Sequence, residues 1–315
     1  MRLSRGGFGL RWRLIGPTRV CFVARKLRAG QRAELYVIEV ASGERRLVYE
    51  SSELLFEAPN WVGDWLIVNG DGGLFRVPVS GGELERIELG GVPEINNDHV
   101  VSPDGETVYV SAEDGHLYAV PLAGGVGRRV SNDNGVHHYL HGISPDGSRL
   151  AYIGLESRDG RRITNVYTVP AGGGVDVQVT DDEFADDGSE YGPDGWIYFN
   201  SERAGHAQLF RTKDNLVEQL TFDERVNWFP HPAPDGSAIA YVSFPPGTEG
   251  HPADIPDVHL RLLYPTGPPQ DLLALYGGQG TMNVPSWSPT STSFAYVTYP
   301  IAAVDEQRRT ERSTE

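Results

Sequence analysis

The sequence predicts an all-β protein, a six-bladed β-propeller of the TolB-like type with four-stranded blades. Three observations predict this fold: a turn motif occurs six times, an alternating apolar segment follows each copy, and the 315 residues include 38 Gly and 22 Pro. Short strands separated by regular turns are typical of propeller blades. Because one blade cannot bury both of its faces, the repeats are expected to stack into a closed ring.

The repeated turn has the form Ser-Pro-Asp-Gly and is called the hook here. Pro fixes φ, the Asp side chain accepts from the turn backbone, and Gly takes the positive φ. The copies are about 40 to 55 residues apart, a spacing typical of propeller repeats. They lie in VVSPDG from Val100, GISPDG from Gly142, EYGPDG from Glu190, HPAPDG from His231, SWSPTS from Ser286 and a shortened NWVGD from Asn60.

A second strand and a turn follow each hook strand except the last, as in LYAVPLAGG from Leu117. The first unit of this kind, LYVIEVASGE from Leu35, precedes the first hook, and the last hook at Ser288 has none after it. The N-terminal strands are therefore expected to complete the last blade and close the ring. The segment RVCFVAR, residues 19–25, predicts one more strand, either an added edge strand or part of a seventh blade.

Composition limits the location and the partners. We predict an N-terminal segment over 1–18, a single propeller domain over 19–300 and a disordered charged tail over 301–315. The net charge of −16 disfavours binding to nucleic acid or to an anionic membrane. One cysteine allows no intrachain disulfide and no cysteine-based zinc site. The absence of a signal-like or membrane-spanning apolar segment in this sequence predicts a cytoplasmic protein.

The hooks resemble the PD40 repeats, which are WD40-like, of the TolB-like propeller superfamily. That superfamily includes the Tol-system propeller, the propellers of prolyl-oligopeptidase-type peptidases and the oligogalacturonate lyases. FEAPNW from Phe56, NNDHVVSPDG from Asn96 and GGQGTMNVPSWSP from Gly277 are similar to a group of uncharacterised six-bladed bacterial members. The resemblance covers residues 35–299 and implies the fold without implying one activity. No Gly-x-Ser-x-Gly elbow, P-loop or dinucleotide motif is present, so neither a peptidase nor an organic cofactor is expected.

Residues just before each hook are expected to converge near the propeller axis. His99 and His141 lie three residues before the hook serine, whereas Glu190 and His231 lie two residues before the equivalent position. Neighbouring strand residues face opposite sides, so a β-bulge would be needed to turn both sets inward. Otherwise His99 and His141 would face a neighbouring blade. The complete predicted ring is Asn60, His99, His141, Glu190, His231 and Ser286.

Two chemistries fit this ring, with Glu190, His141 and His231 as the candidate catalytic residues. Imidazoles with a carboxylate or amide oxygen suit divalent Mn, Fe, Zn or Ni. The resemblance to the oligogalacturonate lyases implies a metal held by His99, His141 and His231 with Gln279 or Glu190. That metal would acidify the proton next to a uronate carboxylate. Without a metal, Glu190 and a histidine could act as an acid/base pair on a sugar hydroxyl or glycosidic bond.

Other polar residues are candidates for ligand binding. The segment GGQGTMN, from Gly277, offers hydrogen bonds to a sugar, although it could be an ordinary connection between blades. Arg203 could bind a carboxylate or form a salt bridge within its own blade. The acidic stretch 180–188 could bind Ca or be a solvated loop. The predicted ligand-binding residues are Asn60, Asn97, Arg203, Gln279, Thr281 and Asn283.

Two further segments contain histidines. The insertion at residues 244–260 is rich in Pro and Gly and is expected to be a loop at the rim, carrying His251. His137 and His138 are expected in a loop.

The leading hypothesis is a carbohydrate-active enzyme, lyase-like or hydrolase-like, acting on a small oligosaccharide or uronide. The alternative is a non-catalytic TolB-like propeller that binds a protein partner at its rim.

Overall fold

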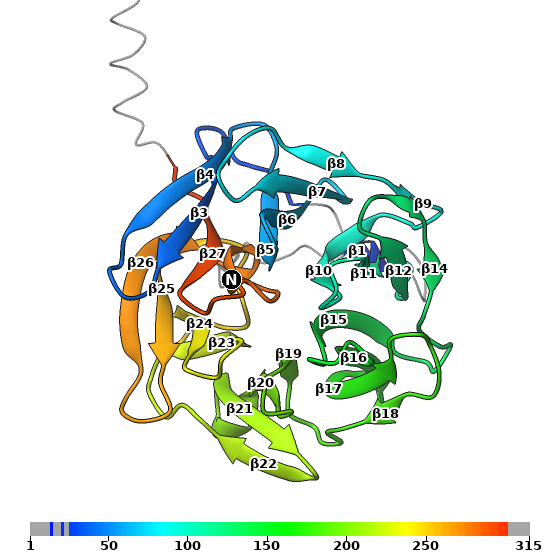
Figure 1. Ribbon diagram of the computed structural model, residues 1–315. Helices are drawn as coiled ribbons and strands as arrows, with labels where there is room; N and C mark the ends of the chain where they lie inside the picture. The colour runs from blue at the N-terminus through cyan, green and yellow to red at the C-terminus, as the bar shows by residue number, and fades with distance from the viewer. Residues whose placement is uncertain (1–12, 15–19, 22–24, 302–315) are drawn as a thin grey trace, which may run out of the picture.

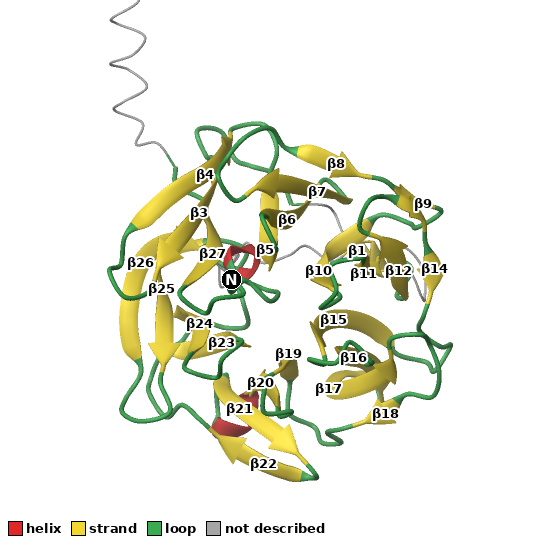
Figure 2. Cartoon of the chain, in the orientation of Figure 1, coloured by secondary structure: helices red, strands yellow, loops and turns green. Residues whose placement is uncertain are grey.

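The computed structural model is a ring of six β-sheets around a central axis (Figure 1). It describes residues 13–14, 20–21 and 25–301. Helical structure in these residues is limited to two short 3₁₀ turns, η1 (Glu202–Ala204) and η2 (Gln279–Thr281), and strands dominate (Figure 2). The predicted all-β six-bladed propeller is therefore confirmed.

Five blades are four-stranded antiparallel sheets whose strands follow one another outward from the axis. Blade one contains β5 (Phe56–Val62), β6 (Trp65–Gly70), β7 (Gly73–Pro78) and β8 (Glu85–Ile87). Blade two contains β10 (Ile95–Val101), β11 (Thr107–Ala112), β12 (Leu117–Pro121) and β14 (Arg128–Arg129). Blade three contains β15 (His137–Ile143), β16 (Arg149–Arg158), β17 (Arg161–Pro170) and β18 (Val177–Gln178).

Blades four and five continue the same pattern. Blade four contains β19 (Asp186–Tyr191), β20 (Ile197–Ser201), β21 (Gln208–Lys213) and β22 (Leu216–Gln219). Blade five contains β23 (Val226–Pro232), β24 (Ile239–Phe244), β25 (Ile255–Leu263) and β26 (Gln270–Gly277). At the rim, a short parallel pair of β9 (Leu89–Gly90) and β13 (Gly125–Val126) joins the connections that follow blade one and β12.

Blade six is built from both ends of the described chain. The C-terminal β27 (Ser293–Thr298) pairs with β3 (Ala33–Glu39), which pairs with β4 (Arg45–Ser51) (Figure 1). A single bridge between Trp287 and Phe294 occupies the innermost position, where the other blades have a full strand. The prediction that N-terminal strands close the ring is confirmed.

The predicted strand over residues 19–25 is described only in part. β2 (Val20–Cys21) pairs with β1 (Arg13–Leu14) in a separate two-stranded sheet. Over the described ranges the blades number six, so no seventh is formed there. Most of the predicted 1–18 segment, and the tail from residue 302 onward, lie outside the described residues. No described helix is long and apolar enough to span a membrane.

The inner strand of each four-stranded blade contains a register shift before its hook. In β15 the shift is at His141, between the paired residues Leu140 and Gly142. In β19 and β23 it lies at Gly188 and Phe229, which adopt φ of 65° and 56°. A bulge of this kind places two residues of one strand opposite one residue of its neighbour. The shifts in β5 and β10 lie between Glu57 and Asn60 and between Ile95 and His99. The type of bulge that the predicted ring requires is therefore present.

Residues 282–287, called the axial segment, connect blade five to blade six. All but Pro285 are buried. Asn283 Nδ2 donates to Asp98 Oδ1 of blade two at 2.7 Å, and His141 Nδ1 of blade three donates to the Asn283 carbonyl at 3.2 Å. The segment also bonds blade one through Asn60, Trp61 and Pro59, and blade five through His231. It therefore fastens blade six to four other blades.

We expect Asn283→Ala to destabilise the protein because it removes a donor from the buried Asp98 carboxylate. Losing one partner of a buried polar group costs about 1 to 3 kcal/mol. The urea midpoint should fall, whereas the exposed Gln270→Ala on β26 should leave it unchanged. Equal midpoints for the two variants would contradict a supporting role for the axial segment.

Candidate functional site

The candidate site lies on the inner strands, which line the axis of the ring (Figure 1). Asp98 on β10, His141 on β15, Asp187 on β19 and His251 on the insertion loop form a group called the Asp–His cluster. Asp187 lies between the two histidines. Its Oδ1 is 3.0 Å from His141 Nε2, and its Oδ2 is 3.5 Å from His251 Nε2. Residues from three inner strands and one loop thus come together around Asp187.

His141 is held as an imidazolium. Its Nδ1 faces the Asn283 carbonyl and its Nε2 faces the Asp187 carboxylate, so both ring nitrogens face acceptors. Burial alone would lower the pKa of His141, but Asp98 and Asp187 outweigh burial and raise the pKa to about 9. The side chain is only 4% exposed. A buried cation therefore lies at the centre of the cluster.

The two carboxylates beside His141 differ in their proton affinity. Burial raises the pKa of Asp98 to about 6, although His141 and the donors on Asn283 and Asn96 oppose the rise. Burial also acts on Asp187, but there the hydrogen bond and charge of His141 prevail and lower the pKa. Asp187 is therefore ionised at neutral pH.

Solvent reaches the cluster at its outer edge. The side chains of His251 and Asp187 are 26% and 24% exposed, in contrast to buried His141. The His251 ring packs edge-on against Trp228, with ring centres 4.6 Å apart. Burial lowers the pKa of His251, although Asp187 opposes this, so its imidazole is neutral at pH 7. A partly exposed neutral imidazole thus lies beside an ionised carboxylate and near a buried imidazolium.

Glu190 and His231, two predicted catalytic residues, form a separate pair between blades four and five. Glu190 Oε2 is 2.6 Å from His231 Nδ1, and His231 Nε2 donates to the Met282 carbonyl at 3.1 Å. Burial raises the pKa of Glu190, and the charge and hydrogen bond of His231 only partly offset that rise. Both side chains are buried, so the pair lies behind the solvent-facing edge of the site.

The predicted binding residues separate into two groups. Asn283 reaches the cluster, and Asn97 is buried beside Asp98 on β10. The backbone of Gln279 contacts the insertion loop, because its N–H donates to the Pro252 carbonyl at 2.9 Å. Thr281 accepts from the Gly278 N–H at 2.9 Å and so holds the η2 turn.

Asn60 and Arg203 have structural contacts instead. The side chain of Asn60 bonds the Val101 N–H at 2.9 Å and the Pro285 carbonyl, joining blades one and two to the axial segment. Arg203 pairs within its own blade region with Asp182 and Asp186, each at 3.1 Å. The salt-bridge alternative for Arg203 is thus the one that the structure contains. Asp182 and Asp186 belong to the acidic stretch 180–188, the candidate Ca site, and both carboxylates pair with Arg203.

The histidines proposed as metal ligands do not fit a metal. His99 Nε2 faces the Ile67 carbonyl of blade one at 3.4 Å, so His99 follows the alternative of facing a neighbouring blade. His141 and His231 have both ring nitrogens occupied by protein acceptors. Within the ranges that the structure describes, no group of three or more His, Cys, Asp or Glu side chains could hold a metal ion. The set of His99, His141, His231 and Gln279 therefore does not assemble.

Sequence reasoning missed Asp98 and Asp187 and gave His251 only a rim position. Asp98 precedes His99 and Asp187 lies three residues before Glu190, so acidic residues beside the predicted ring were the available signal.

The expectation that His137 and His138 lie in a loop is wrong. They begin β15 and pair with Leu155 and Gly154, because β16 extends beyond the usual length of a second strand. His138 is buried and contacts the Gly115 carbonyl at 2.7 Å.

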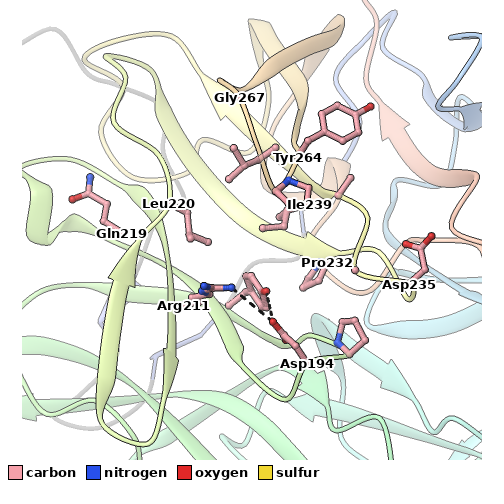
Figure 3. A pocket seen from close by; sticks show the side chains of 15 residues that line it. Asp194, Arg211, Gln219, Leu220, Pro232, Asp235, Ile239, Tyr264 and Gly267 are labelled. Carbon is pink, nitrogen blue, oxygen red and sulfur yellow. Dashed lines mark hydrogen bonds and ion pairs between the residues drawn. The ribbon is translucent and has the colours of Figure 1, made fainter.

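A hollow lies at the hook ends of β19 and β23, away from the Asp–His cluster. It has a volume of about 680 Å³ and lies between blades four and five (Figure 3). Asp194 projects at its edge, where it accepts from the Tyr198 hydroxyl at 2.9 Å and lies 3.8 Å from Arg211. These polar groups already satisfy one another, so the hollow adds no reactive group to the site.

Comparison with known proteins places the chain in a family. No family model matches the sequence. An uncharacterised protein of Agrobacterium fabrum is 37% identical over 279 residues, covering 85% of this chain and 92% of that protein. A solved structure from Agrobacterium tumefaciens, described as a candidate TolB, is 36% identical with a TM-score of 0.79, covering 86% and 99% of the two chains. The chain belongs to this TolB-like family.

More distant solved structures share only the fold of this TolB-like protein. TolB from Acinetobacter baumannii is 19% identical with a TM-score of 0.55, over 83% of this chain and 56% of that one. An oligogalacturonate lyase in complex with manganese is 13% identical with a TM-score of 0.51, over 82% and 73% of the chains. The expected resemblance to both groups is confirmed at the level of the fold.

Because the pKa of His141 is raised, the free energy of unfolding should fall at alkaline pH. The folded pKa is about 9 and the ordinary value is 6.5, so the stabilisation is complete below pH 6.5 and is lost as pH rises through 9. The loss should be on the order of 3 kcal/mol, from about 1.4 kcal/mol per pKa unit. Urea unfolding at about pH 6.5 and about pH 10 measures it.

The matched variant is His141→Gln, which cannot titrate. It should be less stable than the unmodified protein at about pH 6.5, but its midpoint should fall less at alkaline pH. The same alkaline fall in both proteins would show that the stability change comes from other groups.

Proposed function

We propose that this TolB-like propeller is a carbohydrate-active enzyme that hydrolyses a small neutral oligosaccharide at the Asp–His cluster. One observation supports this most directly: Asp187 lies between the buried His141 imidazolium and the partly exposed His251 imidazole. A histidine oriented by a carboxylate is a common arrangement for general base catalysis.

Each residue has a role that its environment suits. Neutral His251 would take a proton at Nδ1, which is buried and has no hydrogen-bond partner among the described residues, from a water that enters beside it, and Asp187 would stabilise the resulting imidazolium. Glu190, on the same strand as Asp187, has a raised pKa; because it is buried behind the edge of the site, it would pass a proton to the glycosidic oxygen through a bridging water. Water adds to the sugar carbon as the carbon–oxygen bond to the leaving sugar breaks. Reprotonation of Glu190 and deprotonation of His251 complete the cycle.

Charge favours a neutral sugar over a uronide. At pH 7, Asp187 is ionised and Asp98, with a pKa of about 6, is mostly ionised, whereas His141 supplies one positive charge. His251 is neutral because burial lowers its pKa. A uronate carboxylate would therefore meet an environment without excess positive charge. The proposal accordingly uses the hydrolase-like route and needs no metal.

A binding propeller without catalysis is the second candidate. It is favoured by the contacts of His141 and His231, whose ring nitrogens are all engaged within the protein. In that case the cluster would hold blades together, and a protein partner would bind elsewhere on the rim. A cytoplasmic location and a small carbohydrate partner stay predictions under the first candidate.

Sugar release from a panel of neutral oligosaccharides and uronides tests the enzyme. Asp187→Asn and His251→Gln should each lower turnover by about a hundredfold or more, the usual size of general acid–base effects. The matched control is Asp181→Asn, whose side chain is 70% exposed and pairs at 3.5 Å with Arg158. It should retain the turnover of the unmodified protein.

Three outcomes would change the assignment. Neutral sugars that raise the melting temperature without being cleaved would support the binding propeller instead. A preference for uronides would contradict the charge argument. Turnover that is lost in EDTA and restored by Mn²⁺ would contradict the metal-free route.

A further inference from the structure

The insertion loop, residues 245–254, is fixed to the rest of the ring at two points that follow His251, Pro252 and Asp254. We infer that Arg25 and Asp254 are positioning residues that hold this loop, and with it His251, against the Asp–His cluster. Their catalytic meaning rests on the proposed function, but the positioning can be measured without any substrate. Neither residue touches the cluster, so both act through the loop.

The outer attachment is the Asp254 carboxylate. Its Oδ2 lies 2.5 Å from Arg25 Nη2 and accepts from Gln31 Nε2 at 2.9 Å, and its Oδ1 contacts Arg28. The carboxylate is only 10% exposed. Three donors from residues 25–31 therefore converge on one side chain of the loop. Charge-assisted hydrogen bonds that are shielded from water are among the stronger polar contacts.

Arg25 connects the loop to two blades. Its Nη1 lies 2.8 Å from Glu57 Oε1 on β5, and its guanidinium lies 4.0 Å above the ring of Tyr299, just beyond β27. A planar guanidinium can bind two carboxylates and stack on an aromatic ring at once, whereas an ammonium group lacks this geometry. Arg25 thus ties the loop of blade five to blades one and six.

The inner attachment uses the backbone before η2. The Gln279 N–H donates to the Pro252 carbonyl at 2.9 Å, next to His251. At Gly278 an added Cβ would overlap the carbonyl oxygens of Pro252 and Ala253. The loop can approach η2 this closely because residue 278 has no side chain.

Just before these attachments the loop places His251 near Asp187 and against Trp228. Gly247 and Gly250 in the same loop have φ of 77° and 61°, a region that glycine adopts without strain. They give the loop points at which it can bend. Release of Asp254 would therefore let the loop move and take His251 away from Asp187.

Hydrogen exchange of residues 245–254 tests this inference in the full chain. Arg25→Ala and Gly278→Ala should each lower amide protection in the loop by about tenfold or more, equivalent to at least about 1.4 kcal/mol. Arg25→Lys should give a smaller loss, because it retains the charge but not the fork. The matched control is Arg32→Ala, which removes an arginine that is 55% exposed and pairs with Glu34; it should change nothing in the loop.

The NMR signals of the His251 ring give a second readout. Contact with Trp228 should shift them, and Arg25→Ala should move them toward values for an exposed histidine. Normal loop protection in folded Arg25→Ala would overturn the inference, and so would an equal loss of protection in every blade. Gly278→Ala provides the test if Arg25→Ala does not fold. A protein without sugar turnover that shows the predicted loop changes would contradict the proposed function alone.

Discussion

The axial segment is the contact on which the rest of the ring depends. One short stretch of chain, residues 282–287, makes hydrogen bonds to blades one, two, three and five. These bonds are mostly buried, so water cannot readily replace them, and each lost partner would leave a polar group unsatisfied. The polar residues near the axis are thus largely the means by which separate sheets are joined.

The same contacts set the charges at the candidate site. His141 faces a backbone carbonyl and a carboxylate, and this makes it an imidazolium. The imidazolium keeps Asp187 ionised, and Asp187 in turn lies beside His251 at the solvent edge. Structure and chemistry are therefore linked through one buried histidine, and the insertion loop decides how closely the outer histidine approaches.

The hook repeat was sufficient to predict the blades and the closure by N-terminal strands, because these depend on local turns and on apolar alternation. The ring of polar residues was predicted in part, and the required bulges are present. The predicted metal set does not assemble, because His99, His141 and His231 have backbone carbonyls as partners. Asp98 and Asp187 escaped notice because the repeat does not show which residues a bulge turns toward the axis.

Blade six has a mechanical consequence. Its β27 and β3 come from opposite ends of the described chain and are held by six residue pairs, from Ser293–Glu39 to Thr298–Glu34. A cellular unfoldase that pulls on either terminus would load this pairing before any other blade. Once it separated, blades one and five would each lose a neighbour, and unravelling could proceed around the ring in both directions. The resistance of the whole domain to extraction by force would therefore be set at this one junction.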